Sequence, residues 1–293
     1  MEKTVKKNML SSVIPGISSL AKRGLGGWLV IIGAIIVAII IVMTLFSPWI
    51  TPYDPARIEV GPLMNPPCSS YLFGTDDVGH DMLSRVLAGG RIMIQVAVLS
   101  VVVCFIIGVP LGLFSSYAGG VIDRFVGIIM DSIYAFPGLI LAIAIAAMLG
   151  RGVLNMAFSI AVVYIPSYFR VVRSQVLSIR EMPYVEAAIA AGAKSRTVLL
   201  RHILPNVVPS IVVVATVNFA DAILTAAGLT FVGLGVNINV PDWGWDLTNG
   251  RRLIVSGAWW VATFPGIMII LLALGFTFMG EGLSEILNPK LEQ

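Results

Sequence analysis

Residues 28–46 read WLVIIGAIIVAIIIVMTLF, an apolar run that contains no charged residue. Its length is close to the roughly 20 residues that an α-helix needs to cross the hydrocarbon core of a bilayer. The run is longer than the core of a signal peptide, and no small-residue cleavage site follows it. We therefore expect a retained first transmembrane helix at 28–46, preceded by a basic cytoplasmic segment at 1–27.

The composition of the whole chain supports a membrane protein. Of its 293 residues, 57% are hydrophobic and 12% are charged, and the mean hydropathy is +0.93. Soluble domains carry about a quarter charged residues. The net charge of +3 gives no indication of nucleic-acid binding. The two cysteines, Cys68 and Cys104, lie in a proline-rich stretch and an apolar run, so no disulfide is expected.

Six apolar segments are long enough to span a membrane, which predicts an all-α bundle of about six transmembrane helices. An external loop at 47–91 follows the first of them, and a five-helix core at 92–283 includes a long cytoplasmic loop at 178–206. A cytoplasmic tail at 284–293 ends the chain, and no separate soluble domain is indicated. The predicted spans are approximately 28–46, 92–116, 126–149, 153–177, 207–235 and 261–283.

The distribution of lysine and arginine predicts the orientation. With the N-terminus inside, 13 of the 19 basic residues fall on cytoplasmic segments and 6 fall outside. The excess of positive charge inside favours cytoplasmic N- and C-termini. Arg251 and Arg252, which fall outside, are the main exceptions.

The cytoplasmic loop contains the sequence PYVEAAIAAGAKSRTVLLRHILPN at residues 183–206. Pro183 is suited to the first position of a helix and Gly192 to the position after its end. The short helix between them would have a nearly smooth alanine surface that a partner's cleft could approach closely. A second short helix is expected from Ser195, as N-cap, to Leu204, where Pro205 would stop it. On these grounds alone a docking element and an ordinary interfacial connection remain equally open.

The motif in this loop resembles the EAA loop of ABC importer permeases. The matching residues are Glu186-Ala187-Ala188, Gly192 with Ala193 after it, and Leu204-Pro205. In that family the loop forms a coupling helix that sits in a groove of the ATPase subunit. The resemblance therefore implies a type I importer-like permease, with these residues coupling it to the ATPase.

Other segments resemble the dipeptide/oligopeptide/nickel branch of this family. They are the FGTDD run at 73–77 with its continuation to Arg91, the AFP run at 135–137, the GLTFVGLG run at 228–235 and the PDWG run at 241–244. Two positions depart from the branch: His80 stands where arginine is usual, and Ala226 stands where glutamate is frequent.

The resemblance implies a complex in a prokaryotic cytoplasmic membrane. Its partners would be a second, similar permease, two ATPase subunits that bind ATP and magnesium, and an external solute-binding protein facing residues 47–91 and 236–260. This chain itself would bind no cofactor. Peptide is the expected cargo, while nickel and oligosaccharides remain open because the branch handles all three.

Candidate charged residues fall into two groups. Asp131 and Asp221 lie within predicted spans, where ionisable residues are expensive and mark a translocation path, a gate or structural pairing. Asp221 lies five residues before Ala226 and is a candidate replacement for the missing glutamate. The external group comprises Asp76, Asp77, His80, Asp81 and, further along the chain, Trp243.

A metal site in the external group is one alternative. Asp77, His80 and Asp81 would share one face if they lay on a helix, and carboxylates with an imidazole suit a divalent ion. The simpler interpretation is that Asp76 caps a helix and the others are solvated at the membrane edge. We adopt this interpretation and expect no metal.

Other classes of function lack the residues that they need. Gly192-Ala193-Lys194-Ser195 resembles part of a phosphate loop, but glycine is absent directly before Lys194 and five places before that. A membrane enzyme would need convergent nucleophile, base or metal ligands. His80 and His202 are the two histidines of the chain, and the predicted topology puts them on opposite sides of the membrane. A passive channel remains an alternative, although it would need no docking loop.

Overall fold

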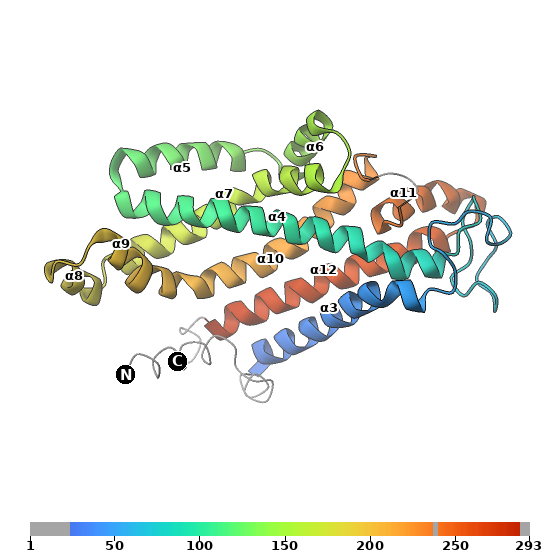
Figure 1. Ribbon diagram of the computed structural model, residues 1–293, viewed down its shortest axis with the longest axis horizontal. Coiled ribbons are helices and arrows are strands. Elements are labelled where there is room, and N and C mark those ends of the chain that lie inside the picture. The colour runs from blue at the N-terminus through green and yellow to red at the C-terminus, as the bar shows by residue number, and fades with distance from the viewer. Residues whose placement is uncertain (1–23, 237–239, 288–293) are drawn as a thin grey trace.

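The structure is a computed structural model that describes residues 24–236 and 240–287, and its regular elements in these ranges are helices (Figure 1). Those in the first half are α3 (Gly24–Ile50), α4 (Met82–Ala118), α5 (Gly120–Tyr134), α6 (Gly138–Leu149) and α7 (Val153–Arg180). The second half contains α8 (Pro183–Ala190), α9 (Ser195–Thr197), a π-helix (Val198–Ile203), α10 (Leu204–Phe231), α11 (Trp243–Leu253), a 3₁₀ turn (Ile254–Ser256) and α12 (Trp260–Leu287).

Five helical segments are long and apolar enough to cross a membrane: α3, α4, α7, the continuous stretch Ser195–Phe231 and α12. A sixth span results if the bent pair of α5 and α6 is counted as one. The prediction of an all-α bundle with about six membrane helices is therefore confirmed. Residues 1–23 and 288–293, which hold most of the predicted terminal segments, lie outside the described residues.

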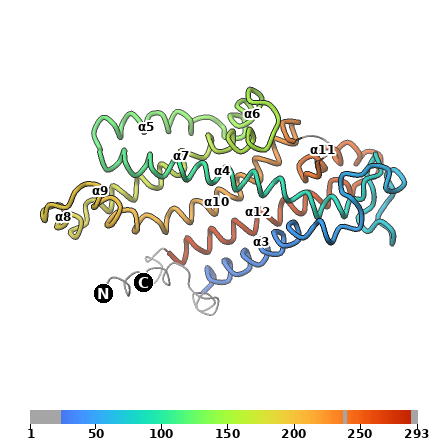
Figure 2. The backbone as a smooth tube through the Cα atoms, in the orientation of Figure 1, coloured from blue at the N-terminus to red at the C-terminus, as the bar shows by residue number. Residues whose placement is uncertain are grey.

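The third predicted span, 126–149, is not a continuous helix. The axes of α5 and α6 differ by 91°, and α6 turns away from the line of α5 (Figure 2). The break falls at Ala135-Phe136-Pro137. Proline has no backbone N–H to donate and disfavours helical geometry in the residue before it, so the helix ends ahead of Pro137 and a new one begins at Gly138.

Small residues bring the long helices into close contact. A β-carbon on Gly33 of α3 would collide with the carbonyl of Gly275 in α12. In the same way, Gly108 and Gly112 of α4 lie directly against α7, where Tyr168 and Val172 would meet any added side chain. Such contacts stabilise helix pairs in lipid, where the hydrophobic effect between helices is weak.

The region of the predicted cytoplasmic loop also differs from the prediction. The helix that starts at Ser195 does not stop at Pro205 but passes through the π-helix Val198–Ile203 into α10. Pro205 lies in the first turn of α10, directly after the π-helix. The π-helix therefore continues directly into α10 at the point where the sequence predicted that the helix would end.

The second long helix begins earlier than predicted, at Met82 rather than near residue 92. Asp81 has extended backbone geometry and its carboxylate accepts a hydrogen bond from the backbone N–H of Ser84, which makes it the N-cap. The connection between α3 and α4, which the sequence predicts to be external and which we call the external connection, therefore spans 51–81. It packs beside α11 at one end of the bundle, and α8 lies at the opposite end (Figure 1).

Candidate functional site

The first candidate site is α8 with the turn that follows it. Pro183 occupies the first turn of the helix. Val185 is fully buried and belongs to an apolar cluster with Val198, Leu199 and Ile203, so one side chain attaches α8 to the π-helix. The other side chains of α8 are exposed, except that Ala188 is half-buried. The exposed face of α8 is therefore accessible to a partner, while Val185 holds the helix against the π-helix.

Gly192 closes α8 through a Schellman motif. Its N–H donates to the carbonyl of Ile189 at 2.9 Å, and the N–H of Ala193 donates to the carbonyl of Ala188 at 3.0 Å. The φ angle of Gly192 is +81°, a left-handed conformation that penalises residues with a β-carbon. A β-carbon at this position would have no other heavy atom within 4 Å. In this chain the requirement for glycine is therefore conformational and not steric.

The remaining residues of the EAA-like motif lie on either side of this turn. Glu186 and Ala187 are exposed, and Glu186 forms no ion pair with any residue in the described ranges. Leu204 packs against the same apolar cluster as Val185, and Pro205 follows it in the first turn of α10. The motif residues thus share one end of the bundle, with Val185 and Leu204 as its apolar attachments.

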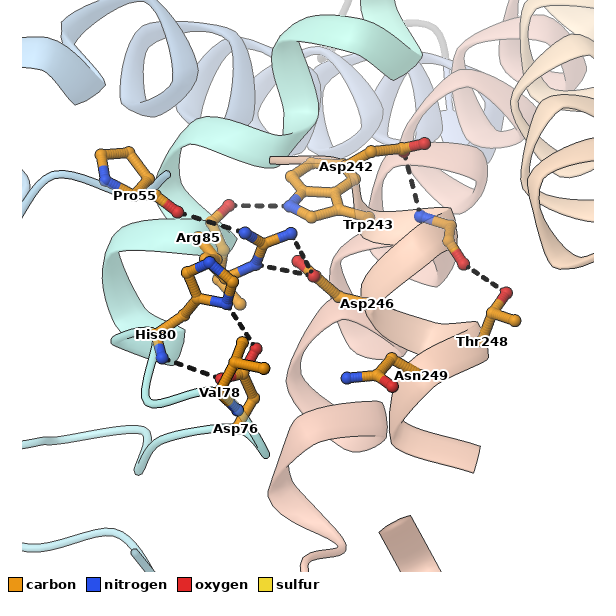
Figure 3. A network of polar contacts seen from close by, with 12 residues as sticks. Pro55, Asp76, Val78, His80, Arg85, Asp242, Trp243, Asp246, Thr248 and Asn249 are labelled. Atoms are coloured by element: carbon orange, nitrogen blue, oxygen red, sulfur yellow. Dashed lines mark hydrogen bonds and ion pairs between the residues drawn. The ribbon is translucent and has the colours of Figure 1, made fainter. Parts of the chain in front are cut away.

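The second candidate site is a polar network at the opposite end of the bundle (Figure 3). Asp76 organises its loop: one carboxylate oxygen accepts from the backbone N–H groups of Val78 and His80, and the other lies 2.6 Å from Nδ1 of His80. Burial raises the pKa of the Asp76 carboxyl, but the hydrogen bonds and charge of His80 outweigh this and the net pKa is lowered.

The other residues of the external group do not form the helix face that the sequence suggested. Asp77, His80 and Asp81 all precede α4. Asp77 is exposed and accepts a hydrogen bond from Asn249 of α11 at 2.7 Å, whereas Asp81 is buried and caps α4. Asp81 is therefore the cap expected at Asp76, and His80 and Asp81 are not solvated. No cluster of three metal-type ligands occurs among the described residues.

An ion pair joins the start of α4 to α11. Nε of Arg85 donates to a carboxylate oxygen of Asp246 at 2.7 Å, and the two side chains are 1% and 3% exposed. The guanidinium also donates to the carbonyl of Pro55 at 3.2 Å. Arg85 thus connects the external connection, α4 and α11 in one buried contact.

Trp243 lies near this ion pair and is fully buried (Figure 3). Its indole N–H donates to the carbonyl of Val86 at 2.7 Å. Gly89 and Gly90 of α4 lie against the ring, and a β-carbon on Gly90 would come within 2.7 Å of it. The sequence indicated Trp243 only through its resemblance to the family, and the two glycines carried no recognisable signal for this contact.

Two buried acids complete the external network. Asp242 caps α11 by accepting from the backbone N–H of Gly244, and burial raises the pKa of its carboxyl to about 7. Burial also raises the pKa of Asp246, against the effect of Arg85. One carboxylate oxygen of each has no hydrogen-bond partner within the described part of the chain. Asp246 was not identified from the sequence, where it has the appearance of an ordinary helix residue.

Asp131 lies in α5 and pairs with Arg170 of α7 at 2.7 Å, and both side chains are substantially exposed. A second pair, Asp123 with Arg173, lies nearer the start of α5. The two pairs line a cleft of about 630 Å³ between α5 and α7. Exposed charges of this kind are unfavourable against acyl chains, so this face suits a water-filled path or a protein partner.

Asp221 lies in a different cleft, of about 750 Å³, between α7, α10 and α12. Its side chain is neither fully buried nor paired with a basic residue in the described ranges. Ala226 is fully buried in an apolar core cluster. The two positions therefore have different environments in the bundle.

Comparison with known proteins identifies the family. Residues 108–293 match the model of binding-protein-dependent transport system inner membrane components, and residues 28–67 match the N-terminal TM domain of oligopeptide transport permease C. The chain is 40% identical to the dipeptide transport system permease protein DppC of Alkalihalophilus pseudofirmus, over 90% of this chain and 86% of that one. It is 38% identical to the probable D,D-dipeptide transport system permease protein DdpC of Escherichia coli K12, over 90% and 89%.

A solved structure has the same fold. A chain of the MetNI methionine ABC transporter in an inward-facing conformation superimposes with a TM-score of 0.55 at 20% identity, over 71% of this chain and 98% of that one. Together with the membrane helices and the matched residues, these relationships confirm the family indicated by the EAA-like motif. The chain belongs to the binding-protein-dependent transport system inner membrane components, the multi-pass permease subunits of prokaryotic ABC importers.

Proposed function

We propose that this permease carries di- or oligopeptides across the cytoplasmic membrane. Three relatives support this cargo by their names: a dipeptide permease, a di/tripeptide permease of Pseudomonas aeruginosa that is 38% identical, and a glutathione permease of Escherichia coli O6:K15:H31 that is 39% identical. The chain would form the path together with a second permease subunit. A binding protein would deliver the peptide, and two ATPase subunits would bind ATP and magnesium.

The observation that carries the mechanism is the construction of α8. The helix exposes Glu186, Ala187 and Ala190 while Val185 attaches it to the π-helix that continues into α10. A partner bound to this face would push on α8, and Val185 would transmit the displacement to a membrane-spanning helix. We therefore assign α8 as the coupling helix that contacts an ATPase subunit.

The external end of the bundle would receive the binding protein. The connection 51–81 and α11 are held together by the Arg85–Asp246 ion pair and by the hydrogen bond between Asp77 and Asn249. This rigid surface lies at the opposite end from α8 (Figure 1). With α8 in the cytoplasm, both chain termini would be cytoplasmic, in agreement with the distribution of basic residues.

A matched pair of glycines tests the coupling role. Gly192 and Gly257 have φ angles of +81° and +87°, and an added β-carbon would have no other heavy atom within 4 Å at either position. Gly192→Ala and Gly257→Ala should therefore cause similar backbone strain, about 1–2 kcal/mol. Gly257 lies after the external 3₁₀ turn and Gly192 lies after α8.

The assay is retention of ATPase subunits on the purified complex, with peptide uptake into vesicles. Gly192→Val and Glu186→Lys should leave the protein inserted but release the ATPases or uncouple their activity, and Gly192→Ala should weaken uptake more than Gly257→Ala. Full uptake and normal ATPase retention in all three α8 variants would contradict the assignment. The cargo itself is tested by mass spectrometry of the ligand that the binding protein retains.

A further inference from the structure

The cleft beside Asp221 has the position of a binding site within the membrane. Asn206 lies in the first turn of α10 and Leu287 ends α12. Both line the end of the cleft that is nearest to α8. Asp221 is 17 residues after Leu204, which places it about 25 Å further along α10 at 1.5 Å per residue. The cleft therefore leads from the end of the bundle that carries α8 to a carboxylate deep within it.

The lining of this cleft is polar on two facing helices. Ser167 and Gln175 of α7 face it at a spacing of two helical turns, and Ser210, Asn218 and Asp221 of α10 face it from the other side. Lipid-facing surfaces do not carry such groups, since each would be unsatisfied in hydrocarbon. Its volume of about 750 Å³ is within the range of small-molecule sites.

Asn218 provides an independent indication of a ligand. It is 4% exposed and its amide NH₂ has no hydrogen-bond partner among the residues described. Tyr168 lies close to Asn218. The Tyr168 hydroxyl also has no hydrogen-bond partner of normal geometry in the described part of the chain. A buried amide that lacks a hydrogen-bond partner is destabilising, and a bound carbonyl group would remove this penalty.

The charge of the cleft selects the chemistry of the ligand. Asp221 is the one ionisable residue in its described lining, which contains no lysine, arginine or histidine. One carboxylate brings a single negative charge to the cleft, which matches the single positive charge of an ammonium group. The site therefore suits an organic cation that also carries a hydrogen-bond acceptor.

We propose that Asp221 and Asn218 form a transient site for the amino-terminal end of the peptide cargo. The Asp221 carboxylate accepts hydrogen bonds from the peptide's ammonium group, and the Asn218 amide donates to its first carbonyl group. This inference rests on the proposed peptide transport and adds the residues that the peptide meets inside the membrane. The serines and Gln175 supply weaker, sequence-independent contacts along the rest of the cleft.

The test compares uptake by vesicles that contain the complete complex, with the same binding protein in every sample. The cargo is a peptide without lysine, so that its only ammonium group is the amino terminus. Asp221→Asn should reduce uptake at least tenfold while ATPase activity stimulated by the binding protein stays within twofold of the parent. Asp221→Glu should restore part of the uptake, and Asn218→Ala should cause a smaller loss.

Glu281→Gln is the matched control, because Glu281 is an exposed acid of α12 that does not line the cleft. Uptake within twofold of the parent in Asp221→Asn would overturn the site. Dissociation of the second permease from the purified Asp221→Asn complex would also overturn it, since the carboxylate would then pair with that subunit. An effect confined to lysine-containing peptides would contradict recognition of the amino terminus. If the parent complex imports no peptide, the proposed function itself fails.

Discussion

Arg85 of α4 and Asp246 of α11 form a buried ion pair at 2.7 Å between residues that are 161 positions apart in the chain. Both side chains are almost completely excluded from solvent. The pair joins two segments at the end of the bundle opposite α8, so the geometry of that end depends on it. A desolvated charge of this kind is stabilising only while its partner is present.

Removal of one partner should therefore destabilise the protein strongly. Arg85→Ala or Asp246→Ala leaves an uncompensated buried charge, and we expect a loss of about 3–5 kcal/mol. The double variant Arg85→Met/Asp246→Leu should lose much less. The measurement is the thermal unfolding midpoint of the detergent-purified protein.

The control for this prediction is the exposed pair of Asp131 and Arg170, whose side chains are 65% and 43% exposed. Asp131→Ala should cost about 0–1 kcal/mol. Equal effects of Asp131→Ala and Asp246→Ala would contradict the importance assigned to the buried pair.

Gly90 should not tolerate a larger residue. A β-carbon there would lie within 2.7 Å of the buried ring of Trp243, and Gly90→Ala should cost about 1–3 kcal/mol through overpacking. Gly127→Ala is the matched control, because this helical glycine has no neighbour within 4 Å of an added β-carbon. It should stabilise α5 by about 0.5–1 kcal/mol. Thermal midpoints that fall equally in both variants would contradict the predicted contact.

The raised pKa of Asp242 predicts a dependence of stability on pH. Its carboxyl titrates at about 7 in the folded protein and near 3.8 when it is unperturbed, so the folded state binds more protons between these values. The free energy of unfolding should therefore fall as the pH rises from about 4 to about 7, by at most about 1.4 kcal/mol per pH unit from this group. Asp246, whose pKa is also raised, acts in the same direction, and Arg85 opposes both shifts.

Asp242→Asn should reduce this slope between about pH 4 and about pH 7, since asparagine stays neutral and can still cap α11. Asp76 does not interfere, because its pKa is lowered and its contribution is lost only in more acidic solution. Asp77→Asn is the control, an exposed acid outside the buried cluster. An unchanged slope in Asp242→Asn would show that another group titrates.

The helical fold was largely accessible from the sequence, because each span depends on a local run of apolar residues. The start of α8 at Pro183 and the turn at Gly192 were also predictable from local backbone chemistry. Two predicted helix boundaries were wrong because more than one local signal was present. Asp81 rather than Asp76 caps α4, and Pro205 lies in the first turn of a helix that it was expected to end.

The candidate sites were less predictable because they depend on long-range contacts. Nothing near Arg85 in the sequence indicates Asp246 as its partner. Likewise, the place of Asp221 in a polar cleft follows only from the way α7, α10 and α12 pack together. His80, interpreted as a solvated residue, is instead paired with Asp76 by the fold of the external connection.

The orientation is tested by cysteine labelling in intact cells. Single cysteines at Ser70 and Ser195 are suitable because both positions are exposed, whereas Asn239 lies outside the described residues. The background should replace the exposed Cys68 by serine, while the buried Cys104 can remain. A membrane-impermeant thiol reagent should label position 70 from outside and position 195 only after lysis. External labelling at position 195 would reverse the orientation and exclude α8 from contact with the ATPases.

The most direct test of the central claim is a cross-link from α8 to an ATPase subunit in the assembled complex. Ala187→Cys, in the Cys68→Ser background, places a reactive thiol on the exposed side of α8, and Ser256→Cys places a matched one on the exposed 3₁₀ turn at the other end. A short thiol-to-amine cross-linker should join position 187, and not position 256, to an ATPase chain, with a yield that changes when ATP is added. Absence of an ATPase cross-link at position 187 in a complex that still imports peptide would contradict the assignment of α8 as the coupling helix.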